Sequence, residues 1–292
     1  MLKRQSRADL GDDHLNSLLP DVQVDRRGFI AAALAAGFAA TAEPVLAQAI
    51  STPMDGLVGG DGKIGDIPIY YAVPKGADKR AVVIVVPEIW GNHEHIKDVV
   101  RRVAKAGYFA VANEPYFRIG ELWKMTEVKE VLAGANKLTD EQAFADLDAV
   151  VAWAERQPRA NARKLGITGF CRGGRMVWMY TAHNKKVDAG VAWYGTLVET
   201  PTMPTSPIDV ADKIDRPVLG LYGGADQGIP VDHVERMRAG LLAFGNDAKS
   251  QIHVYEGMPH AFNADYRPSY RKEAADDGWK RMLAWFKKHG VA

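Results

Sequence analysis

The sequence predicts an α/β fold with a mostly parallel, doubly wound sheet and helices on both of its faces. Continuous apolar runs, of which residues 81–86 are the clearest, are typical of strands that a parallel sheet buries on both sides. Such runs alternate along the chain with segments of helical periodicity. This alternation predicts parallel strands joined by helical crossovers, and it places a ligand at the carboxyl ends of the strands.

The elements can be assigned in chain order. Alternating apolar residues between Ile67 and Val73 predict a β-hairpin at the entrance of the domain. Thr139 and Gln142 have the spacing of a capping box at the start of a helix. The segment 196–212 contains several Pro and Thr residues, and the sequence leaves open whether it forms a semi-rigid rim or a lid. The remaining strands are expected at residues 81–86, 108–112, 165–169, 187–194, 217–222 and 250–255, and the helices at residues 95–105, 139–156, 173–183, 231–244 and 272–288.

Composition excludes several classes of function. The chain has 292 residues, is 47% hydrophobic and 25% charged, and carries a formal net charge of +1. This balance, without long basic runs, argues against a nucleic-acid partner and against binding to an anionic membrane. Cys171 is the one cysteine, so the chain forms no internal disulfide and has a single thiol for chemistry. We expect neither a metal nor a cofactor.

The first 49 residues have the features of an export signal. Arg26-Arg27-Gly28-Phe29 precede an uncharged, alanine-rich run that is too short to span a bilayer comfortably. Paired arginines followed by Gly-Phe are similar to a twin-arginine signal, which directs the export of a folded protein. Small residues place the expected cleavage near Ala47 or Ala49. The alternative is an Ala-rich amphipathic helix packed on the domain.

The chain is therefore divided into a signal segment, residues 1–49, and a single domain, residues 50–292. We expect the twin-arginine export machinery as a partner and the periplasm as the location, without membrane association after cleavage. A signal that does not function would leave the protein in the cytoplasm. The oligomeric state is left open.

The most informative stretch is LGITGFCRGGRM, residues 165–176, which predicts a buried strand, a turn and the start of an apolar helix. Gly169, Gly173 and Gly174 allow a turn too sharp for side chains, and Cys171 lies at its apex. Gly-Phe-Cys-Arg-Gly is thus a nucleophile elbow of the G-x-S-x-G type with sulfur in place of the hydroxyl. That geometry aims backbone N–H groups at a developing oxyanion.

Two further turns supply the partners that a thiol nucleophile needs. Asp226 follows the strand at 217–222, and His260 follows the strand at 250–255. The chain order nucleophile, acid, histidine is the order that this type of fold uses. Each residue alone is weak evidence, because a lone cysteine is more often a core residue and an aspartate after a strand a turn former. Together, three turns at one sheet edge predict a catalytic triad.

These motifs carry a resemblance to a known family. The chain resembles the dienelactone hydrolase family of the α/β-hydrolase fold over roughly residues 55–290. The resemblance rests on Val86-Pro87-Glu88-Ile89-Trp90-Gly91, Gly169-Phe170-Cys171-Arg172-Gly173-Gly174, Gly224-Ala225-Asp226 and His260-Ala261-Phe262. An acidic residue after the first long strand, combined with a cysteine elbow, is characteristic of the family.

The resemblance implies a mechanism and a set of site residues. It implies hydrolysis of a small lactone or ester through an acyl-cysteine intermediate. In the family the glutamate rests against the thiol until substrate binding displaces it. The residues implied are Cys171, His260 and Asp226 as the triad, Glu88 as an auxiliary residue, and the backbone N–H groups of Ile89 and Arg172 as the oxyanion hole.

One departure from the family concerns the substrate. The well-known members carry an arginine shortly after the catalytic histidine that binds the substrate carboxylate, whereas Asn263 and Ala264 follow here. The physiological substrate is therefore left open. The arginines that could take this role are Arg118, Arg172, Arg175 and Arg267, and the side chains expected at the pocket are Trp90, Tyr116, Arg118 and Phe262.

Other patterns favour no separate function. The glycines of residues 60–65 fit G-x-G-x-x-G but lack the strand before and the helix after that a dinucleotide site requires. His93-Glu94-His95 lacks metal-site spacing, and we interpret it as a solvated loop or a helix start. The alternative to an enzyme is a catalytically silent α/β-hydrolase scaffold that binds a ligand or partner in the periplasm. The reactivity of the thiol distinguishes the two.

Overall fold

The structure, a computed structural model, describes residues 50–292. The strands are β1 (Leu57–Ile64), β2 (Ile67–Pro74), β3 (Arg80–Val86), β4 (Phe109–Asn113), β5 (Ala160–Phe170), β6 (Ala189–Trp193), β7 (Val218–Gly223) and β8 (Gln251–Tyr255). They form one eight-stranded sheet in the order β1-β2-β4-β3-β5-β6-β7-β8. The export signal predicted for residues 1–49 lies outside the described residues.

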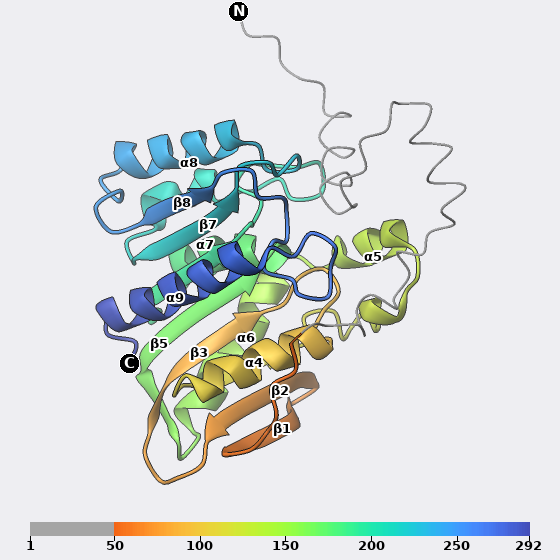
Figure 1. The fold of residues 1–292 in the computed structure, drawn as a ribbon, viewed down its shortest axis with the longest axis vertical. Coiled ribbons are helices and arrows are strands. Elements are labelled where there is room, and N and C mark those ends of the chain that lie inside the picture. Colours follow the sequence, from red (N-terminus) through yellow and green to blue (C-terminus); the bar gives the residue numbers. More distant parts are fainter. Residues whose placement is uncertain (1–49) are drawn as a thin grey trace, which may run out of the picture.

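The sheet is parallel from β4 to β8, and the predicted hairpin of β1 and β2 joins it antiparallel beside β4. The helices are α4 (Glu94–Lys105), α5 (Val128–Ala135), α6 (Asp140–Glu155), α7 (Arg172–His183), α8 (Val231–Ala243) and α9 (Lys272–Lys288). Figure 1 shows α4 and α9 in front of the sheet, with α6 and α7 on the opposite face. The predicted doubly wound fold is confirmed.

Local sequence accounts for most element boundaries. Residues Ala81–Val86 of β3 are all buried, as a strand covered on both faces requires. The predicted capping box is present at α6, where the Thr139 hydroxyl accepts from the Gln142 N–H at 3.2 Å and the Gln142 side chain accepts from the Thr139 N–H at 3.3 Å. Among the described helices, none is both long and apolar enough to cross a membrane.

Two features differ from the expectations, and the segment that was left open as a rim or a lid is partly ordered. Helix α5 was not expected, and it has only eight residues and no capping side chain. Strand β5 begins at Ala160, five residues before the expected start. The segment 196–212 is partly ordered by a 3₁₀ helix at Ile208–Lys213 and by a bridge between Thr200 and Met203. In that segment Leu197 and Ser206 are fully buried, so parts of it pack on the domain.

Candidate active site

The turn after β5 holds Cys171 in a strained conformation. Its φ is +53° and its ψ is −116°, outside the regions that L-residues favour. The turn is fixed because the Cys171 N–H donates to the Trp193 carbonyl at 3.0 Å and the Cys171 carbonyl accepts from the Arg175 N–H at 3.1 Å. The side chain is buried at the N-terminus of α7. The predicted elbow is therefore present, with the thiol at its apex.

The glycines around Cys171 are required by close backbone contacts. A Cβ atom on Gly169 would lie 2.4 Å from the Gly173 carbonyl oxygen. On Gly173 it would lie 2.2 Å from the Val86 oxygen, and on Gly174 it would lie 2.3 Å from the Trp193 oxygen. Non-bonded atoms do not approach so closely, so each side chain larger than hydrogen would displace β3, β6 or the elbow itself.

His260 and Asp226 form a buried pair at the same edge of the sheet. The Nδ1 atom of His260 lies 2.6 Å from Oδ2 of Asp226. The other oxygen of Asp226 accepts from the N–H groups of Gly228 and Ile229 at 3.0 and 3.1 Å. The opposite imidazole nitrogen, Nε2, is buried and has no hydrogen-bond partner within residues 50–292. Asp226 thus fixes the ring and leaves Nε2 for a reacting group.

The charges around His260 favour its protonated form. Burial opposes that form, but the negative charges of Asp226 and Cys171 outweigh burial and raise the pKa of His260 to about 10. An imidazole with this pKa holds its proton at neutral pH. The edge of the Tyr194 ring contacts the imidazole, with ring centroids 5.1 Å apart, and Tyr194 itself has φ = +38°.

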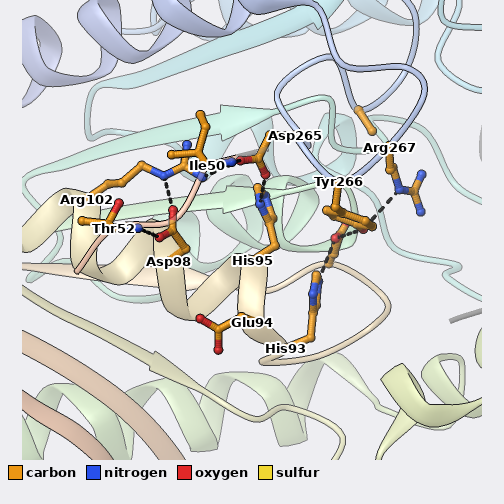
Figure 2. Close-up of polar contacts among 12 residues, drawn as sticks. Ile50, Thr52, His93, Glu94, His95, Asp98, Arg102, Asp265, Tyr266 and Arg267 are labelled. Carbon is orange, nitrogen blue, oxygen red and sulfur yellow. Dashed lines mark hydrogen bonds and ion pairs between the residues drawn. The ribbon is translucent and has the colours of Figure 1, made fainter. Parts of the chain in front are cut away.

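Glu88 lies in the turn after β3 and belongs to a second buried cluster. Its Oε1 lies 3.0 Å from Nε2 of His93, and it also accepts the hydroxyl hydrogen of Tyr266. Arg267 Nε donates to the Tyr266 oxygen at 3.1 Å (Figure 2). Burial alone would keep the carboxyl neutral, but the hydrogen bond from His93 and the charge of Arg267 lower the pKa of Glu88 to about 2. Glu88 is therefore ionised at neutral pH.

The expected solvation of His93-Glu94-His95 is wrong. The segment is a helix start, as expected, but both histidines are buried, with exposed fractions of 3% and 1%. Their rings stack at 5.9 Å because His93 lies just before α4 and not on its face. In the part of the chain that the structure describes, no group of three His, Cys, Asp or Glu side chains fits a metal ion.

His93 and Tyr266 are site residues that sequence reasoning did not find. His93 was singled out by its motif but not connected with Glu88, five residues earlier on the same turn. Tyr266 comes from the loop after His260, 178 residues beyond Glu88. That long-range contact has no signal in a single sequence.

The four candidate arginines differ in their partners. Arg118 forms two 2.7 Å bonds with Asp146, and the buried Arg175 forms two 2.7 Å bonds with Asp140. Arg172 donates to Asn136 Oδ1 at 2.8 Å and to the Leu138 carbonyl at 3.2 Å. For Arg267, Nη1 and Nη2 form no hydrogen bond with another described residue. Among the four arginines, Arg267 is the one whose Nη1 and Nη2 groups are both available to donate to an anion.

The remaining predicted residues occupy different depths. Trp90 and Tyr116 are buried beside the turn after β3, and burial raises the pKa of Tyr116. Phe262 is fully buried and packs on Trp193 and Tyr194, whereas Arg118 lies over the Phe117 ring. The backbone N–H groups of Ile89 and Arg172 donate to no other residue of the described chain, as an oxyanion hole would require.

The partly buried carboxylate of Glu114 fixes the loop that carries Glu88 and Ile89. Glu114 accepts from the Asn92 N–H at 2.7 Å and from the Tyr116 N–H at 2.9 Å. Gly91, with φ = +80°, lets this carboxylate approach, because a Cβ atom there would lie 2.5 Å from its oxygens. Burial raises the pKa of the Glu114 carboxyl and outweighs these two hydrogen bonds, which lower it. The loops after β3 and β4 are thereby joined at the site.

Comparisons with known proteins identify relatives along most of the chain. Residues 67–290 match the model of the dienelactone hydrolase family. A Methylorubrum extorquens protein, provisionally named a carboxymethylenebutenolidase, is 49% identical over 289 residues, which are 96% of this chain and 99% of that protein. A protein of Escherichia coli (strain K12) with the same provisional name is 48% identical over 262 residues, covering 87% and 96% of the two chains.

A more distant relative is found by sequence. A Bradyrhizobium protein, provisionally named a 2-oxo-3-(5-oxofuran-2-ylidene)propanoate lactonase, is 29% identical over 227 residues, or 75% of this chain and 88% of that protein.

Solved structures agree with these relatives. A crystal structure from Klebsiella pneumoniae, provisionally named a dienelactone hydrolase, has 47% identity and a TM-score of 0.76, covering 80% of this chain and 99% of that chain. The acylaminoacyl peptidase of Pyrococcus horikoshii, at 15% identity and a TM-score of 0.64, is similar in fold alone.

Proposed function

The chain belongs to the dienelactone hydrolase family, whose members hydrolyse ester and lactone bonds, and we propose that it cleaves a small lactone or ester with Cys171 as the nucleophile. One observation carries the proposal. Cys171 lies on a strained elbow, and its charge favours the protonated form of the His260 imidazole. Asp226 fixes that imidazole, and its Nε2 has no hydrogen-bond partner among the described residues. This is the arrangement of a nucleophile, a base and an orienting acid.

In the acylation step, Cys171 Sγ attacks the carbonyl carbon of the substrate. The carbonyl oxygen takes the negative charge and is stabilised by the N–H groups of Ile89 and Arg172. When the C–O bond breaks, the leaving oxygen takes the proton from His260 Nε2, and a thioester with Cys171 remains. With a lactone, the leaving oxygen stays attached to the same acyl chain.

Deacylation needs the neutral imidazole. Once Cys171 is acylated its negative charge is gone, and one of the causes that raise the pKa of His260 is removed. His260 then accepts a proton from water while the water oxygen attacks the thioester carbon. The C–S bond breaks, the carboxylic acid is released, and the thiolate and imidazolium return.

Glu88 supports this chemistry as a positioning residue. Its carboxylate binds His93 and Tyr266, and within the described residues it forms no hydrogen bond with Cys171. The ionised carboxylate therefore fixes the loop after His260, which carries Tyr266 and Arg267, against the turn that carries Ile89. In this arrangement Glu88 does not hold the proton of the thiol.

We infer that the preferred substrate is a lactone or ester that bears a carboxylate. Arg267 retains unpaired Nη atoms in the cluster next to Glu88, and its positive charge acts on both Glu88 and Cys171. A planar guanidinium with two free donors fits a carboxylate. The Bradyrhizobium relative carries the name of an anionic lactone substrate, which supports the same class.

The test is hydrolysis of a dienelactone and a panel of short aryl esters by wild type, Cys171→Ala and His260→Ala. We expect turnover by wild type and a loss of at least about a thousandfold in both variants, the usual effect of removing a triad member. Inactivity of wild type across the panel, or variants as active as wild type, would favour the silent scaffold.

A further inference from the structure

A chain of hydrogen bonds connects Glu88 with Arg267 through Tyr266. The Tyr266 hydroxyl donates to Glu88 Oε1, and the Tyr266 oxygen accepts from Arg267 Nε at 3.1 Å (Figure 2). The direction of the chain is fixed, because Glu88 is ionised and burial raises the pKa of Tyr266 well above its ordinary value. The phenol therefore keeps its proton and donates it to the carboxylate, which leaves a lone pair on its oxygen for the arginine.

This one contact restrains the guanidinium of Arg267. Nε donates to Tyr266, whereas Nη1 and Nη2 form no hydrogen bond with another described residue. Figure 2 shows both Nη atoms on the side of the guanidinium that faces away from Tyr266. Arg267 is only partly buried, so a ligand can reach these two groups.

The backbone at Arg267 has restraints of its own. The Arg267 N–H donates to the Ala264 carbonyl at 2.9 Å, and the Arg267 carbonyl accepts from the Tyr270 N–H at 3.0 Å. These bonds place the Cα atom but not the end of the side chain, because an arginine side chain has several rotatable bonds. The direction of the guanidinium therefore depends on the Tyr266 hydroxyl.

A guanidinium can bind a carboxylate along two kinds of edge, one formed by Nη1 and Nη2 and one formed by Nε and an Nη atom. In this protein Tyr266 occupies Nε, so the edge formed by Nη1 and Nη2 is the one that remains. Charge alone would attract an anion from many directions. A fixed edge favours a planar group that accepts two parallel hydrogen bonds, as a carboxylate does.

We propose that Tyr266 is a specificity-determining positioning residue, whose hydroxyl holds Arg267 Nε and thereby presents the Nη1–Nη2 edge to the carboxylate of the substrate. Tyr266 itself does not contact the substrate in this arrangement and acts through Arg267. This role rests on the proposed function, because it needs a substrate that carries a carboxylate. The restraint on the guanidinium can be measured without a substrate.

The first test therefore follows the Nε–H group of Arg267 by NMR. Hydrogen exchange of arginine side chains is recorded at mildly acidic pH, and the Arg267 signal is identified by its absence from the spectrum of Arg267→Lys. We expect this proton to exchange at least about tenfold more slowly than the arginine Nε–H protons of the urea-unfolded chain, because it lies in a hydrogen bond to a buried oxygen. Equal rates would overturn the inference.

The second test is Tyr266→Phe, which removes the hydroxyl but keeps the ring that lies 5.5 Å from the Arg267 guanidinium. The readout is the KM for a carboxylate-bearing lactone divided by the KM for a neutral ester. We expect this ratio to rise by at least about fivefold, the effect of one lost hydrogen bond, although the charge of Arg267 is unchanged. A ratio equal to that of wild type would overturn the inference.

Tyr270→Phe is the matched control, because Tyr270 lies on the same loop but outside the chain of hydrogen bonds. It should leave the KM ratio within about twofold of wild type, as expected for a substitution away from specific contacts. If Tyr270→Phe raised the ratio as much as Tyr266→Phe, the effect would belong to the loop, and the assignment of Tyr266 would be wrong.

Arg267→Lys separates orientation from charge. Lysine keeps the positive charge but has neither an Nε–H group for Tyr266 nor a planar edge, so we expect the KM ratio to rise. Adding Tyr266→Phe to Arg267→Lys should then raise the ratio no further, because the guanidinium that Tyr266 positions is absent. Fully additive effects would mean that Tyr266 acts independently of Arg267.

The outcomes distinguish a failure of this role from a failure of the proposed function. If wild type hydrolyses no ester, or if Arg267→Lys leaves the KM ratio unchanged, the proposed recognition of a carboxylate is wrong, and the substrate role of Tyr266 is wrong with it. If Arg267→Lys raises the ratio and Tyr266→Phe does not, only the role of Tyr266 is wrong. If Tyr266→Phe does not fold, the exchange rate of the Arg267 Nε–H group in wild type still decides whether the hydroxyl holds the guanidinium.

Discussion

At the residue scale, strained backbone is concentrated around the proposed reacting groups. Cys171, Tyr194 and Ala261 are the described non-glycine residues with positive φ, at 53°, 38° and 58°. One is the proposed nucleophile, one packs on His260, and one directly follows His260. Such conformations cost on the order of 1–3 kcal/mol each and persist where the surrounding structure fixes them. For Cys171, the Trp193 carbonyl and the glycine contacts of the elbow do so.

Tyr266→Phe tests the support of Glu88. The change removes the hydroxyl that donates to this buried carboxylate, so we expect the free energy of unfolding to fall by about 1.5–3 kcal/mol, the range for hydrogen bonds to charged groups. Urea unfolding is the measurement. Tyr108→Phe is the control, since Tyr108 packs on Phe286 away from the site and should change stability by less than about 0.5 kcal/mol. Equal effects would contradict the role of Tyr266.

Arg267→Met tests substrate recognition. Loss of the guanidinium should raise KM for a carboxylate-bearing lactone by at least about tenfold, or about 1.4 kcal/mol, and leave KM for a neutral ester within about twofold. Steady-state kinetics with both substrates provides the ratio. Arg118→Met removes an arginine already paired with Asp146 and should leave the ratio unchanged. If Arg118→Met changed the ratio of the two KM values and Arg267→Met did not, the assignment of Arg267 to the substrate carboxylate would be wrong.

The sequence was sufficient to name the groups of the proposed catalytic triad but not all the contacts of the candidate site. Cys171, Asp226 and His260 were predictable because each follows a strand whose carboxyl end is fixed by the topology. The burial of His93 was not, because a polar motif at a helix start resembles a solvated one until a distant partner is known. That partner includes Tyr266, which only the folded chain brings to Glu88.

At the element scale, the elbow depends on the contact between α7 and its neighbouring strands. Gly174 lies where α7 meets the end of β6, and a Cβ atom there would be 2.3 Å from the Trp193 oxygen. The same oxygen accepts the Cys171 N–H. The position of the thiol is therefore set by the packing of the helix on the sheet.

Two glycine substitutions separate packing from helix propensity. Gly174→Ala should lower the free energy of unfolding by more than about 2 kcal/mol, because the methyl group collides with backbone. Gly240 lies within α8, and a Cβ atom there would lie 3.4 Å from the Ala211 Cβ atom. Gly240→Ala should therefore raise the free energy of unfolding by about 0.5–1 kcal/mol. Urea unfolding of both variants measures the difference. A stable Gly174→Ala would contradict the close approach at the elbow.

Element types were predictable where periodicity was strong. The buried run of β3 and the capping box of α6 are examples in which local sequence and tertiary structure agree. Helix α5 was missed because eight residues without a capping side chain give little periodicity. The order of strands β3 and β4 within the sheet depends on long-range pairing, which a single sequence does not contain.

At the scale of the whole molecule, His260 links stability to pH. Its pKa is raised from 6.5 to about 10 in the folded chain by Asp226 and Cys171 against the effect of burial. Below about pH 6.5 both folded and unfolded chains hold the proton, and the stabilisation is complete. As the pH rises through about 10, the folded chain loses the proton and the stabilisation disappears.

His260→Gln should therefore cost more stability at pH 6 than near pH 10. Urea unfolding of wild type and variant across this range measures the difference, which we expect to shrink steadily as the pH rises. Asp226→Asn removes one of the two anions and should flatten the dependence. A difference that grows with pH would contradict the raised pKa.

The most direct measurement of the central claim is intact-mass spectrometry of the protein quenched during turnover of an aryl ester. We expect an added acyl group that peptide mapping places on Cys171, and no adduct on Cys171→Ala. His260→Ala should accumulate the adduct if acylation survives, since water is then no longer activated. Turnover with no acyl adduct, and with Cys171→Ala as active as wild type, would contradict the cysteine mechanism.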